Sequence, residues 1–371
     1  MRIGVPREVK NHEYRVALTP AGAFQLANAG HDVFLQAGAG TGSLIPDDDF
    51  VAAGARILDT AEEVWGTAEM VLKVKEPVPS EYHFLRGDLL LFTYLHLAAD
   101  RPLTERLLTA GTTSIAYETV QLPDRSLPLL APMSEIAGRL APQVGAYHLM
   151  KNEGGRGVLL GGVPGIDCGQ VTVLGGGVSG AHAATIALGM RAEVTVLDLS
   201  LPVLRRLDLQ FHGAVKTIAS NAFNLAQAVR ESDLVIGAVL VPGAAAPKLV
   251  SNELVSEMKP GSVLVDIAVD QGGCFADTHP TTHDDPTFKV HQSVFYCVAN
   301  MPGAVPRSST YALTNATLPY ISAVADLGWQ KAMTLDHAIA AGLSTHHGAL
   351  TNLPVAKAHG LEAVDPYSLV S

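Results

Sequence analysis

Residues 171–198, VTVLGGGVSGAHAATIALGMRAEVTVLD, constrain the fold of this chain more than any other stretch. Gly175, Gly177 and Gly180 lie between a strand-like run and a helical run, and a second strand-like run follows. In a βαβ unit of this kind the first glycine allows a tight turn, the second lets the backbone approach a pyrophosphate, and the third lets helix and strand pack closely. The segment therefore predicts a dinucleotide-binding unit, and a glycine-rich turn that binds no ligand is the alternative.

The second strand of this unit ends in Asp198, which indicates the kind of dinucleotide. A carboxylate at this position accepts hydrogen bonds from the ribose hydroxyls of the adenosine, and its charge repels a 2′-phosphate. No arginine occurs in the residues DLSLP, which begin with this aspartate. We therefore expect NAD rather than NADP as the cofactor.

Strand-like and helical runs alternate along the chain, which is typical of parallel sheets covered by helices. The runs up to residue 128 predict one α/β unit, and those over residues 171–300 predict six strands, the number in a full dinucleotide-binding sheet. Residues 309–328 are expected to form a helix with no strand after it, so that the tail crosses back and packs on the first unit. The expected fold is α/β, with two Rossmann-like doubly wound domains and a cleft between them. The predicted substrate domain is 1–128 plus 307–371, and the predicted NAD-binding domain is 129–306.

Two other stretches lead to specific expectations. Residues 134–151 predict a helix with Ser134 as its N-cap, which Pro142 should kink or split. Residues 168–190 carry no charge and are long enough to span a bilayer. However, the glycines of LGGGVSG next to a strand-like run indicate a turn between two elements. We therefore do not expect a membrane-spanning helix.

Composition limits the possible partners and compartment. The formal net charge is −11 and no run of lysine or arginine occurs, which argues against nucleic acid or an anionic membrane as a partner. The three cysteines are scattered, so neither a zinc site nor a disulfide framework is indicated, and we expect no metal. The N-terminus carries charges where an export signal needs an apolar core. A cytoplasmic protein acting on a small molecule is the expectation.

Four side chains at expected carboxyl ends of strands are candidates for chemistry, because open α/β sheets bind ligands there. Arg15 follows the first strand, Lys75 and His96 end later strands, and Asp270 ends the run SVLVDIAVD. Two cations can hold a small carboxylate, while an imidazole near neutral pKa can exchange a proton during hydride transfer. Taken singly, each residue has an ordinary structural explanation. Arg15 and Lys75 could be surface charges, His96 a core histidine whose ring nitrogens are hydrogen-bonded, and Asp270 a turn-forming residue.

The chain resembles the family of alanine dehydrogenases and NAD-binding transhydrogenase subunits essentially from end to end. The motifs that carry the resemblance are GVPREVKNHEYRVALTPAG, KVKEP, FTYLHLAAD, APMSEIAGR, GVLLGGVPG, LGGGVSG, DLVIGAVLVPGAAAPKLV, VLVDIAVDQGGC and VANMPGAVPRSSTYALTNATLPY. The resemblance implies that Arg15 and Lys75 hold the substrate carboxylate, that His96 is the acid/base, and that Asp270 handles proton transfers to water. Implied cofactor contacts, beside the three glycines, are Ser134, Val178, Asp198, Ser220, Val239, Leu240, Ile267, Asn300 and Met301.

The function that this resemblance implies is the reversible oxidative deamination of L-alanine to pyruvate and ammonium, with hydride transfer to NAD. A homo-oligomer, a hexamer in this family, is also implied. Three alternatives stay open: a transhydrogenase-type hydride carrier, an NAD-sensing module, and a dehydrogenase of the same fold for another amino acid. Sequence alone does not fix the size of the substrate, because one methylene changes discrimination by only about 1–3 kcal/mol.

Overall fold

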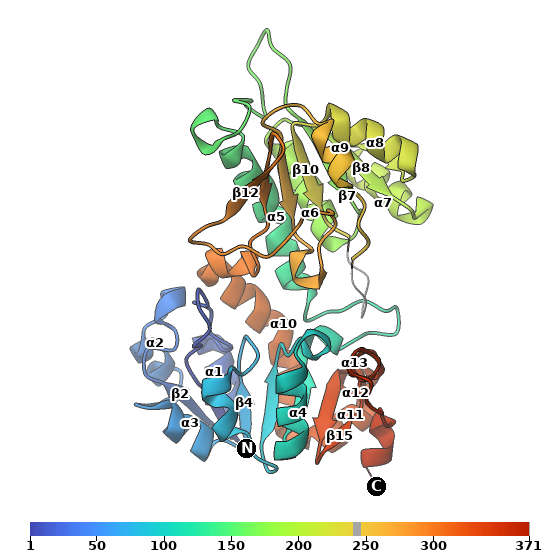
Figure 1. Ribbon diagram of the computed structural model, residues 1–371. Coiled ribbons are helices and arrows are strands. Elements are labelled where there is room, and N and C mark those ends of the chain that lie inside the picture. Colours follow the sequence, from blue (N-terminus) through green and yellow to red (C-terminus); the bar gives the residue numbers. More distant parts are fainter. Residues whose placement is uncertain (240–245, 371) are drawn as a thin grey trace. The chain divides into compact units, whose positions relative to one another are not determined.

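The structure is a computed structural model that describes residues 1–239 and 246–370. It divides into two compact units, shown in Figure 1. The first comprises Met1–Met133 and Val305–Ser371, and the second comprises Ser134–Ala304. Each unit contains one sheet with helices on its faces, and each is described separately below.

The second unit is a doubly wound sheet in the order β12-β13-β11-β10-β7-β8-β9. Its strands are β7 (Gln170–Leu174), β8 (Glu193–Asp198), β9 (Lys216–Ala219), β10 (Leu234–Gly237), β11 (Val263–Asp266), β12 (Thr287–Val290) and β13 (Ser293–Tyr296). All pairs except β12–β13 are parallel. Without β12, the order is that of a six-stranded dinucleotide-binding sheet, with the reversal between β7 and β10.

Both faces of this sheet are buried. Val263 and Val265 of β11 pack in one apolar cluster, and Leu264 packs in the other, because successive side chains of a strand point to opposite faces. The flanking helices are α5 (Ala131–His148), α6 (Val178–Gly189), α7 (Leu201–Phe211), α8 (Ala222–Glu231) and α9 (Asn252–Ser256). Residues of α5, α6 and α7 contribute to the first cluster, and residues of α8 and α9 contribute to the second.

Helix α5 differs from its expectation in two ways. It begins at Ala131, so Ser134 lies in its first turn rather than at the N-cap, and it continues through Pro142 without a break. Close packing on both sides of the proline accounts for this continuity. A Cβ on Gly138 would lie 2.2 Å from the Ser179 carbonyl oxygen, and one on Gly145 would lie 2.6 Å from the Leu234 side chain. Tertiary packing therefore holds the helix where a proline removes one of its hydrogen bonds.

The first unit is a mixed sheet in the order β15-β14-β6-β5-β4-β1-β2-β3. Its strands are β1 (Arg2–Val5), β2 (Asp32–Gln36), β3 (Arg56–Leu58), β4 (Met70–Leu72), β5 (Leu90–Thr93), β6 (Thr113–Ala116), β14 (Leu343–His346) and β15 (Ala349–Leu350). The strands β1 to β6 are parallel, and β14 joins β6 antiparallel. The helices are α1 (Pro20–Asn28), α2 (Asp47–Ala52), α3 (Ala61–Thr67), α4 (Arg101–Ala110), α10 (Pro306–Leu327), α11 (Trp329–Leu335), α12 (His337–Gly342) and α13 (Leu353–His359).

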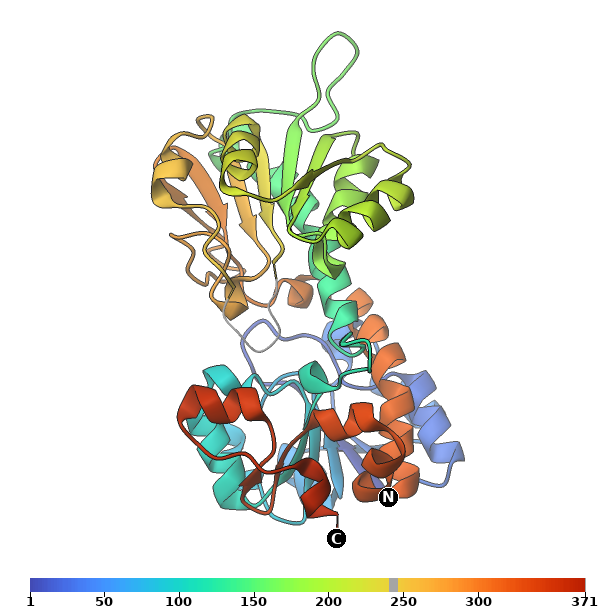
Figure 2. The same cartoon turned by 90° about the vertical axis from the view of Figure 1, so that its right-hand side faces the viewer.

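The predicted fold, two doubly wound α/β units with the first completed by the C-terminal segment, is confirmed. Figure 2 shows this segment, in red, beside the strands of the first unit. The expectation that no strand follows the helix at 309–328 is wrong, because β14 and β15 extend the sheet. The strands β3 and β12 were not expected either. All four are short and lie at or near the sheet edges, where apolar patterning is weak. In the described part of the chain, the helices are too short or too polar to cross a membrane.

A buried ion cluster lies in the first unit, just beyond the end of β4. The Lys73 ammonium lies 3.1 Å from a Glu8 carboxylate oxygen and 2.9 Å from a Glu81 oxygen, and its side chain is 0% exposed. The second Glu8 oxygen accepts a hydrogen bond of 2.6 Å from the Val74 N–H. Burial acts to lower the pKa of Lys73, but the two carboxylates outweigh it and the pKa is raised. The cluster ties the segment after β1 to that after β4.

We predict that Lys73→Met destabilises the first unit by about 3–5 kcal/mol, because removing one partner leaves buried carboxylates uncompensated. The measurement is a urea titration followed by circular dichroism. Lys216→Met, at an exposed lysine of β9, is the matched control and should change the midpoint little. A Lys73→Met protein as stable as the control would contradict this account of the cluster.

Candidate active site

Charged side chains gather at one edge of the first unit's sheet. The neighbouring strands β6, β5, β4 and β1 are parallel, so their carboxyl ends lie at the same edge. Arg15 lies in the segment after β1, Lys75 after β4 and His96 after β5. Glu118 follows β6 and completes the row. Lys75 and His96 do not end strands as expected, because β4 stops at Leu72 and β5 at Thr93, but the three candidates of this unit still follow adjacent parallel strands.

Arg15 is held by Glu13. Its Nε donates to Glu13 Oε1 over 2.6 Å, its Nη2 pairs with Glu13 Oε2, and its backbone N–H donates to Oε1 over 3.1 Å. Nη1 lies 3.0 Å from the Met133 sulfur. Burial acts to lower the pKa of Arg15, but Glu13 outweighs it and the pKa is raised. The guanidinium is therefore a fixed, permanent positive charge.

His96 has a special backbone conformation, with φ 51° and ψ 34° in the left-handed region. Glu118 stabilises this turn, because its Oε1 accepts the backbone N–H of His96 over 2.6 Å and that of Leu95 over 3.1 Å. The His96 ring stacks on Tyr94, with centroids 5.9 Å apart. Tyr94 itself is anchored by a 2.6 Å hydrogen bond from its hydroxyl to the Leu129 carbonyl. The imidazole is half-buried and thus reachable by a ligand.

Lys75 and His96 are linked through the charge of Glu76. Burial acts to raise the pKa of Glu76, but its electrostatic interactions with Lys75, His96 and Lys10 outweigh burial and the pKa is lowered. Glu76 therefore stays ionised beside them, and it pairs with Lys10 through Oε1. Arg15 is near enough to Tyr94 to act on the pKa of its hydroxyl, which burial raises strongly. Arg15, Lys75 and His96 thus share one charged neighbourhood, in which Glu76 interacts with Lys75 and His96, and Tyr94 with Arg15 and His96.

In the second unit the glycine turn has the geometry that its sequence predicts. Gly175 follows β7 with φ +98°, and Gly177 is the N-cap of α6. A Cβ on Gly180 would lie 1.8 Å from the Gly175 carbonyl oxygen, so any side chain there is excluded. A Cβ on Gly177 would meet nothing within 4 Å, so the space in front of the helix N-terminus is open. This turn fits a pyrophosphate, since its backbone can be approached closely.

Asp198, at the end of β8, lies next to this turn. Its Oδ2 accepts the Gly176 N–H over 2.7 Å, and its Oδ1 accepts the Ser200 N–H over 2.7 Å. Both carboxylate oxygens are thereby oriented at the position where a ribose is expected. Arg206 of α7 donates to the Gly176 carbonyl over 2.9 Å, so a cation lies near the turn although none follows Asp198 directly in the sequence.

The other expected nucleotide contacts follow strands at the same edge of the second sheet. Ser220 follows β9, Val239 follows β10, Ile267 follows β11, and Asn300 comes after β13. Val178 and Ser134 lie in the first turns of α6 and α5, and Met301 is a buried residue of the turn Met301–Ala304. Leu240 lies outside the described residues.

Asp270 does not end a strand as expected. β11 ends at Asp266, and Asp270 lies in the 3₁₀ turn η6 (Val269–Gln271) with its side chain exposed. The strand stops where its neighbour does, because Gly237 and Asp266 are the last paired residues of β10 and β11. Asp270 thus belongs to the second unit, whereas Arg15, Lys75 and His96 belong to the first.

Sequence reasoning missed the carboxylates that hold the candidates in place. Glu13 and Glu118 give no signal as partners in the sequence, because their contacts depend on the tertiary structure. Asp266, the true end of β11, was passed over in favour of Asp270. A search for acidic residues within a few positions of strand ends would have found Glu118 and Asp266, but not Glu13, which lies eight residues after the end of β1.

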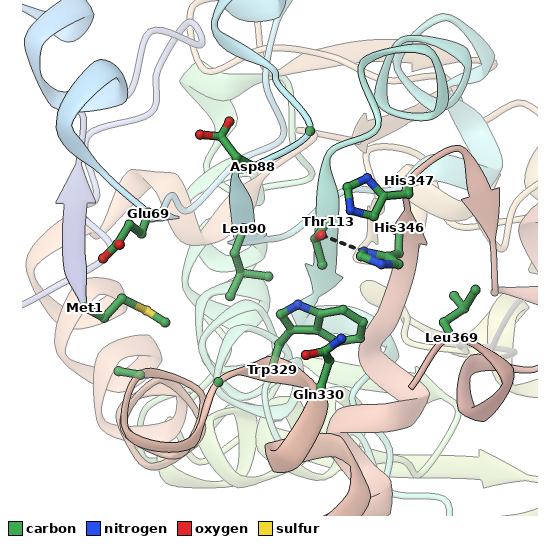
Figure 3. A pocket seen from close by; sticks show the side chains of 13 residues that line it. Met1, Glu69, Asp88, Leu90, Thr113, Trp329, Gln330, His346, His347 and Leu369 are labelled. Carbon is green, nitrogen blue, oxygen red and sulfur yellow. Dashed lines mark hydrogen bonds between the residues drawn. The ribbon is translucent and has the colours of Figure 1, made fainter. Parts of the chain in front are cut away.

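The large cavity in the first unit lies at the opposite edge of the sheet, as Figure 3 shows. Its volume is about 850 Å³, and Glu69, Asp88 and Thr113 line it at the amino ends of β4, β5 and β6. His346 donates to or accepts from the Thr113 hydroxyl over 2.9 Å, and its ring lies 4.6 Å from that of Trp329. None of Arg15, Lys75 and His96 lines this cavity, so it is separate from the candidate site.

Known proteins resemble this chain along its whole length. Residues 4–137 match the family described as alanine dehydrogenase/PNT, N-terminal domain, and residues 141–353 match its C-terminal domain. The chain is 62% identical to the alanine dehydrogenase of Mycolicibacterium smegmatis, over 96% of both chains. A solved L-alanine dehydrogenase superposes with a TM-score of 0.94 at 52% identity, covering 97% of this chain and 99% of the other.

A more distant solved structure is the transhydrogenase of Sinorhizobium meliloti. It superposes with a TM-score of 0.81 at 25% identity, covering 95% of this chain and 99% of the other. Both branches of one family thus share the two-unit fold described above. On the strength of the domain matches and the identity over nearly the full length, the chain belongs to the alanine dehydrogenase/PNT family.

Proposed function

We propose that this protein is an NAD-dependent L-alanine dehydrogenase, which converts L-alanine, NAD⁺ and water reversibly to pyruvate, ammonium, NADH and a proton. The observation that carries the proposal is the cluster of Arg15, Lys75 and His96 after adjacent parallel strands, in a chain of this family. Relatives with 62% and 60% identity are named alanine dehydrogenase, which supports the same reaction here.

In this proposal, Arg15 and Lys75 hold the substrate carboxylate. Both Glu13 carboxylate oxygens bond to the Arg15 guanidinium and fix it before the substrate binds, so little side-chain entropy of Arg15 is lost on binding. Lys75 adds a second positive charge, and it is only 8% exposed, where screening by water is weak. Two fixed cations at one end of a small substrate also set the orientation of its α-carbon.

His96 and Asp270 carry the proton transfers. The substrate ammonium must lose a proton before its nitrogen can form a double bond to the α-carbon, and the His96 imidazole accepts it. The bound nicotinamide supplies the acceptor for the hydride of the α-carbon. Water then adds to the resulting iminium carbon, with Asp270 taking the proton of the water. His96 then returns its proton to the carbinolamine nitrogen, the C–N bond breaks, and the hydroxyl proton passes to the departing ammonia, which gives pyruvate and ammonium. The proton taken from water by Asp270 is released to solvent.

The residues proposed to hold the dinucleotide are those at the carboxyl edge of the second sheet. The turn from Gly175 to Val178 faces the pyrophosphate, Asp198 faces the adenosine ribose, and Gly180 keeps α6 close to β7. NAD is favoured over NADP because the Asp198 carboxylate would repel a 2′-phosphate. We further propose a cytoplasmic homo-oligomer, a hexamer as the family resemblance implies.

A hydride carrier of the transhydrogenase type is the second candidate, and the likeness to the Sinorhizobium meliloti structure favours it. Such a protein passes hydride between two nucleotides and does not need a group that takes protons from a substrate. The fixed Arg15 and the accessible His96 have no use in that reaction. We therefore place amino-acid oxidation first.

The proposal predicts NADH formation, followed by absorbance, when the purified protein receives NAD⁺ and L-alanine at mildly alkaline pH. Glycine, serine, lysine and lactate are tested beside alanine. Turnover on alanine above the others is the expected result, since the relatives at 62% and 60% identity are named alanine dehydrogenase. No turnover on any of them, with NAD still bound, would favour the hydride carrier or an NAD-sensing role.

We predict that His96→Ala and Asp270→Asn each lower kcat on the order of 10²–10⁴-fold, the usual contribution of a general acid or base. NADH binding, measured by its fluorescence, should stay close to that of the unchanged protein. His83→Ala, at an exposed histidine of the same unit, is the control and should keep full turnover. An active His96→Ala protein would show that another group moves the proton.

Asp198→Ala should weaken discrimination between the two dinucleotides, because it removes the charge that repels a 2′-phosphate. The measurement is the ratio of kcat/KM with NAD⁺ to that with NADP⁺, and we expect a fall of at least about tenfold, equivalent to 1.4 kcal/mol. Asp208→Ala, at an exposed aspartate of α7, should leave the ratio unchanged. An unchanged ratio in Asp198→Ala would mean that Asp198 does not face the ribose.

A further inference from the structure

The loop that presents Asp270 leaves β11 at Asp266 and returns to Cys274, within the second unit. Between these ends, Val269 is buried in the apolar core and Asp270 next to it is exposed. The turn is closed by hydrogen bonds from the Gln271 and Gly273 N–H groups to the Ala268 carbonyl, over 2.9 and 3.0 Å. Val269 thus anchors the loop in the core, and Asp270 projects beside it. The loop is also held from outside, by the Ala246 N–H on the Gln271 carbonyl over 2.8 Å and by the Lys248 ammonium on the Gly272 carbonyl.

Asp266 joins the two ends of this loop. Its Oδ1 accepts the Ala268 N–H over 3.1 Å, and its Oδ2 accepts the Cys274 N–H over 2.8 Å. The Thr278 hydroxyl and the Phe275 N–H also bond to the carboxylate. Asp266 is 0% exposed, so these contacts are not exchanged for water. A single carboxylate therefore closes the neck of the loop, from residue 268 on one side to residue 274 on the other.

The glycine before Cys274 is shaped for this carboxylate. Gly273 has φ +75°, which side chains rarely adopt, and a Cβ there would lie 2.5 Å from Asp266 Oδ2 and 2.1 Å from the Thr278 methyl group. The backbone can therefore approach the carboxylate only because position 273 has no side chain. Burial raises the pKa of Asp266, while the hydrogen bonds from Thr278 and the backbone act to lower it. Burying the Asp266 carboxylate costs free energy of desolvation, so we expect this residue to have a specific role.

We propose that Asp266 is a positioning residue for the reaction, which fixes the loop 267–273 and thereby the place of the Asp270 carboxylate. The inference rests on the proposed function, since it gives Asp266 its role through Asp270. Asp266 does not touch the substrate in this account. Its contribution is to keep the proton acceptor in place, because a displacement of about 1 Å in a catalytic group costs on the order of 100-fold in rate.

The test is a double-mutant cycle with Asp266→Asn and Asp270→Asn. An amide at position 266 keeps one acceptor oxygen and turns a donor group toward the N–H groups that the other oxygen accepted. We expect Asp266→Asn alone to lower kcat on the order of 100-fold. The KM for alanine should change little, because Arg15 and Lys75 lie in the other unit. In the Asp270→Asn background, Asp266→Asn should change kcat by less than about twofold, since the two residues act as one unit.

Hydrogen exchange of the full-length protein, followed by mass spectrometry, supplies a second readout that needs no turnover. In Asp266→Asn the amides of 267–274 should exchange faster than in the unchanged protein, while those of 171–180 should not. Asp277→Asn is the matched control, because its carboxylate bonds to the Asn252 side chain at 2.9 and 3.0 Å and not to the loop. If Asp266→Asn does not fold, Thr278→Val removes one donor to the same carboxylate, and its smaller effects should follow the same pattern.

The inference is overturned if loop exchange stays unchanged, or if Asp266→Asn lowers kcat as much in the Asp270→Asn background as in the unchanged protein. Either result would reduce Asp266 to a residue that only stabilises the fold. Wild-type turnover of Asp270→Asn alone would instead contradict the proposed function, and with it the role of Asp266. That outcome is recognised without any change at position 266.

Discussion

Charge can be buried at the edge of the first unit's sheet only because each buried cation has a carboxylate beside it. An unpaired ammonium or guanidinium in an apolar interior costs several kcal/mol, which exceeds most single contributions to stability. Glu13 meets this requirement for Arg15, and Glu8 with Glu81 meets it for Lys73. The same ion pairs also orient the cations. In this unit the contacts that allow the cations to be buried therefore also orient Arg15, which is proposed to hold the substrate carboxylate.

Parallel strands bring the candidate side chains together at one edge of each sheet. Side chains far apart in the sequence, such as Arg15, Lys75 and His96, reach one edge because adjacent parallel strands end there. The second unit uses the same rule with backbone groups, since the turn after β7 offers amides and β8 ends in Asp198. One unit thus presents fixed charges, and the other presents backbone donors and the Asp198 carboxylate, which is proposed to face a ribose. The two sheets share one strand order, β6-β5-β4-β1-β2-β3 in the first unit and β13-β11-β10-β7-β8-β9 in the second. The units differ in which groups their sequences place after those strands.

Local patterns in the sequence predicted the parts of the site that depend on local geometry. The glycine turn was predicted with the right residues, because Gly175 and Gly180 are required by a positive φ and a close approach that no other residue allows. The strand-end rule likewise predicted that Arg15, Lys75 and His96 follow strands at one edge of the first sheet, where the structure has them. The end of β11 was misjudged by four residues, because the apolar run continues past Asp266 while the strand ends with its neighbour β10. Partners such as Glu13 and Glu118, and edge strands such as β14, depend on tertiary contacts that no local pattern records.

The return of the C-terminal segment to the first sheet determines the order in which the molecule can be completed during synthesis. β6 ends at Ala116, but the strand that covers its open side starts at Leu343, so 343 − 116 = 227 residues must be added before the two can pair. At about 5–20 residues per second this takes roughly 10–45 s, during which the contiguous second unit has already emerged. An uncovered β6 presents unpaired backbone groups to any other nascent chain. In the folded chain β14 covers this edge, where the polar side chains of Thr113 and Ser114 bond to His346 and Thr345.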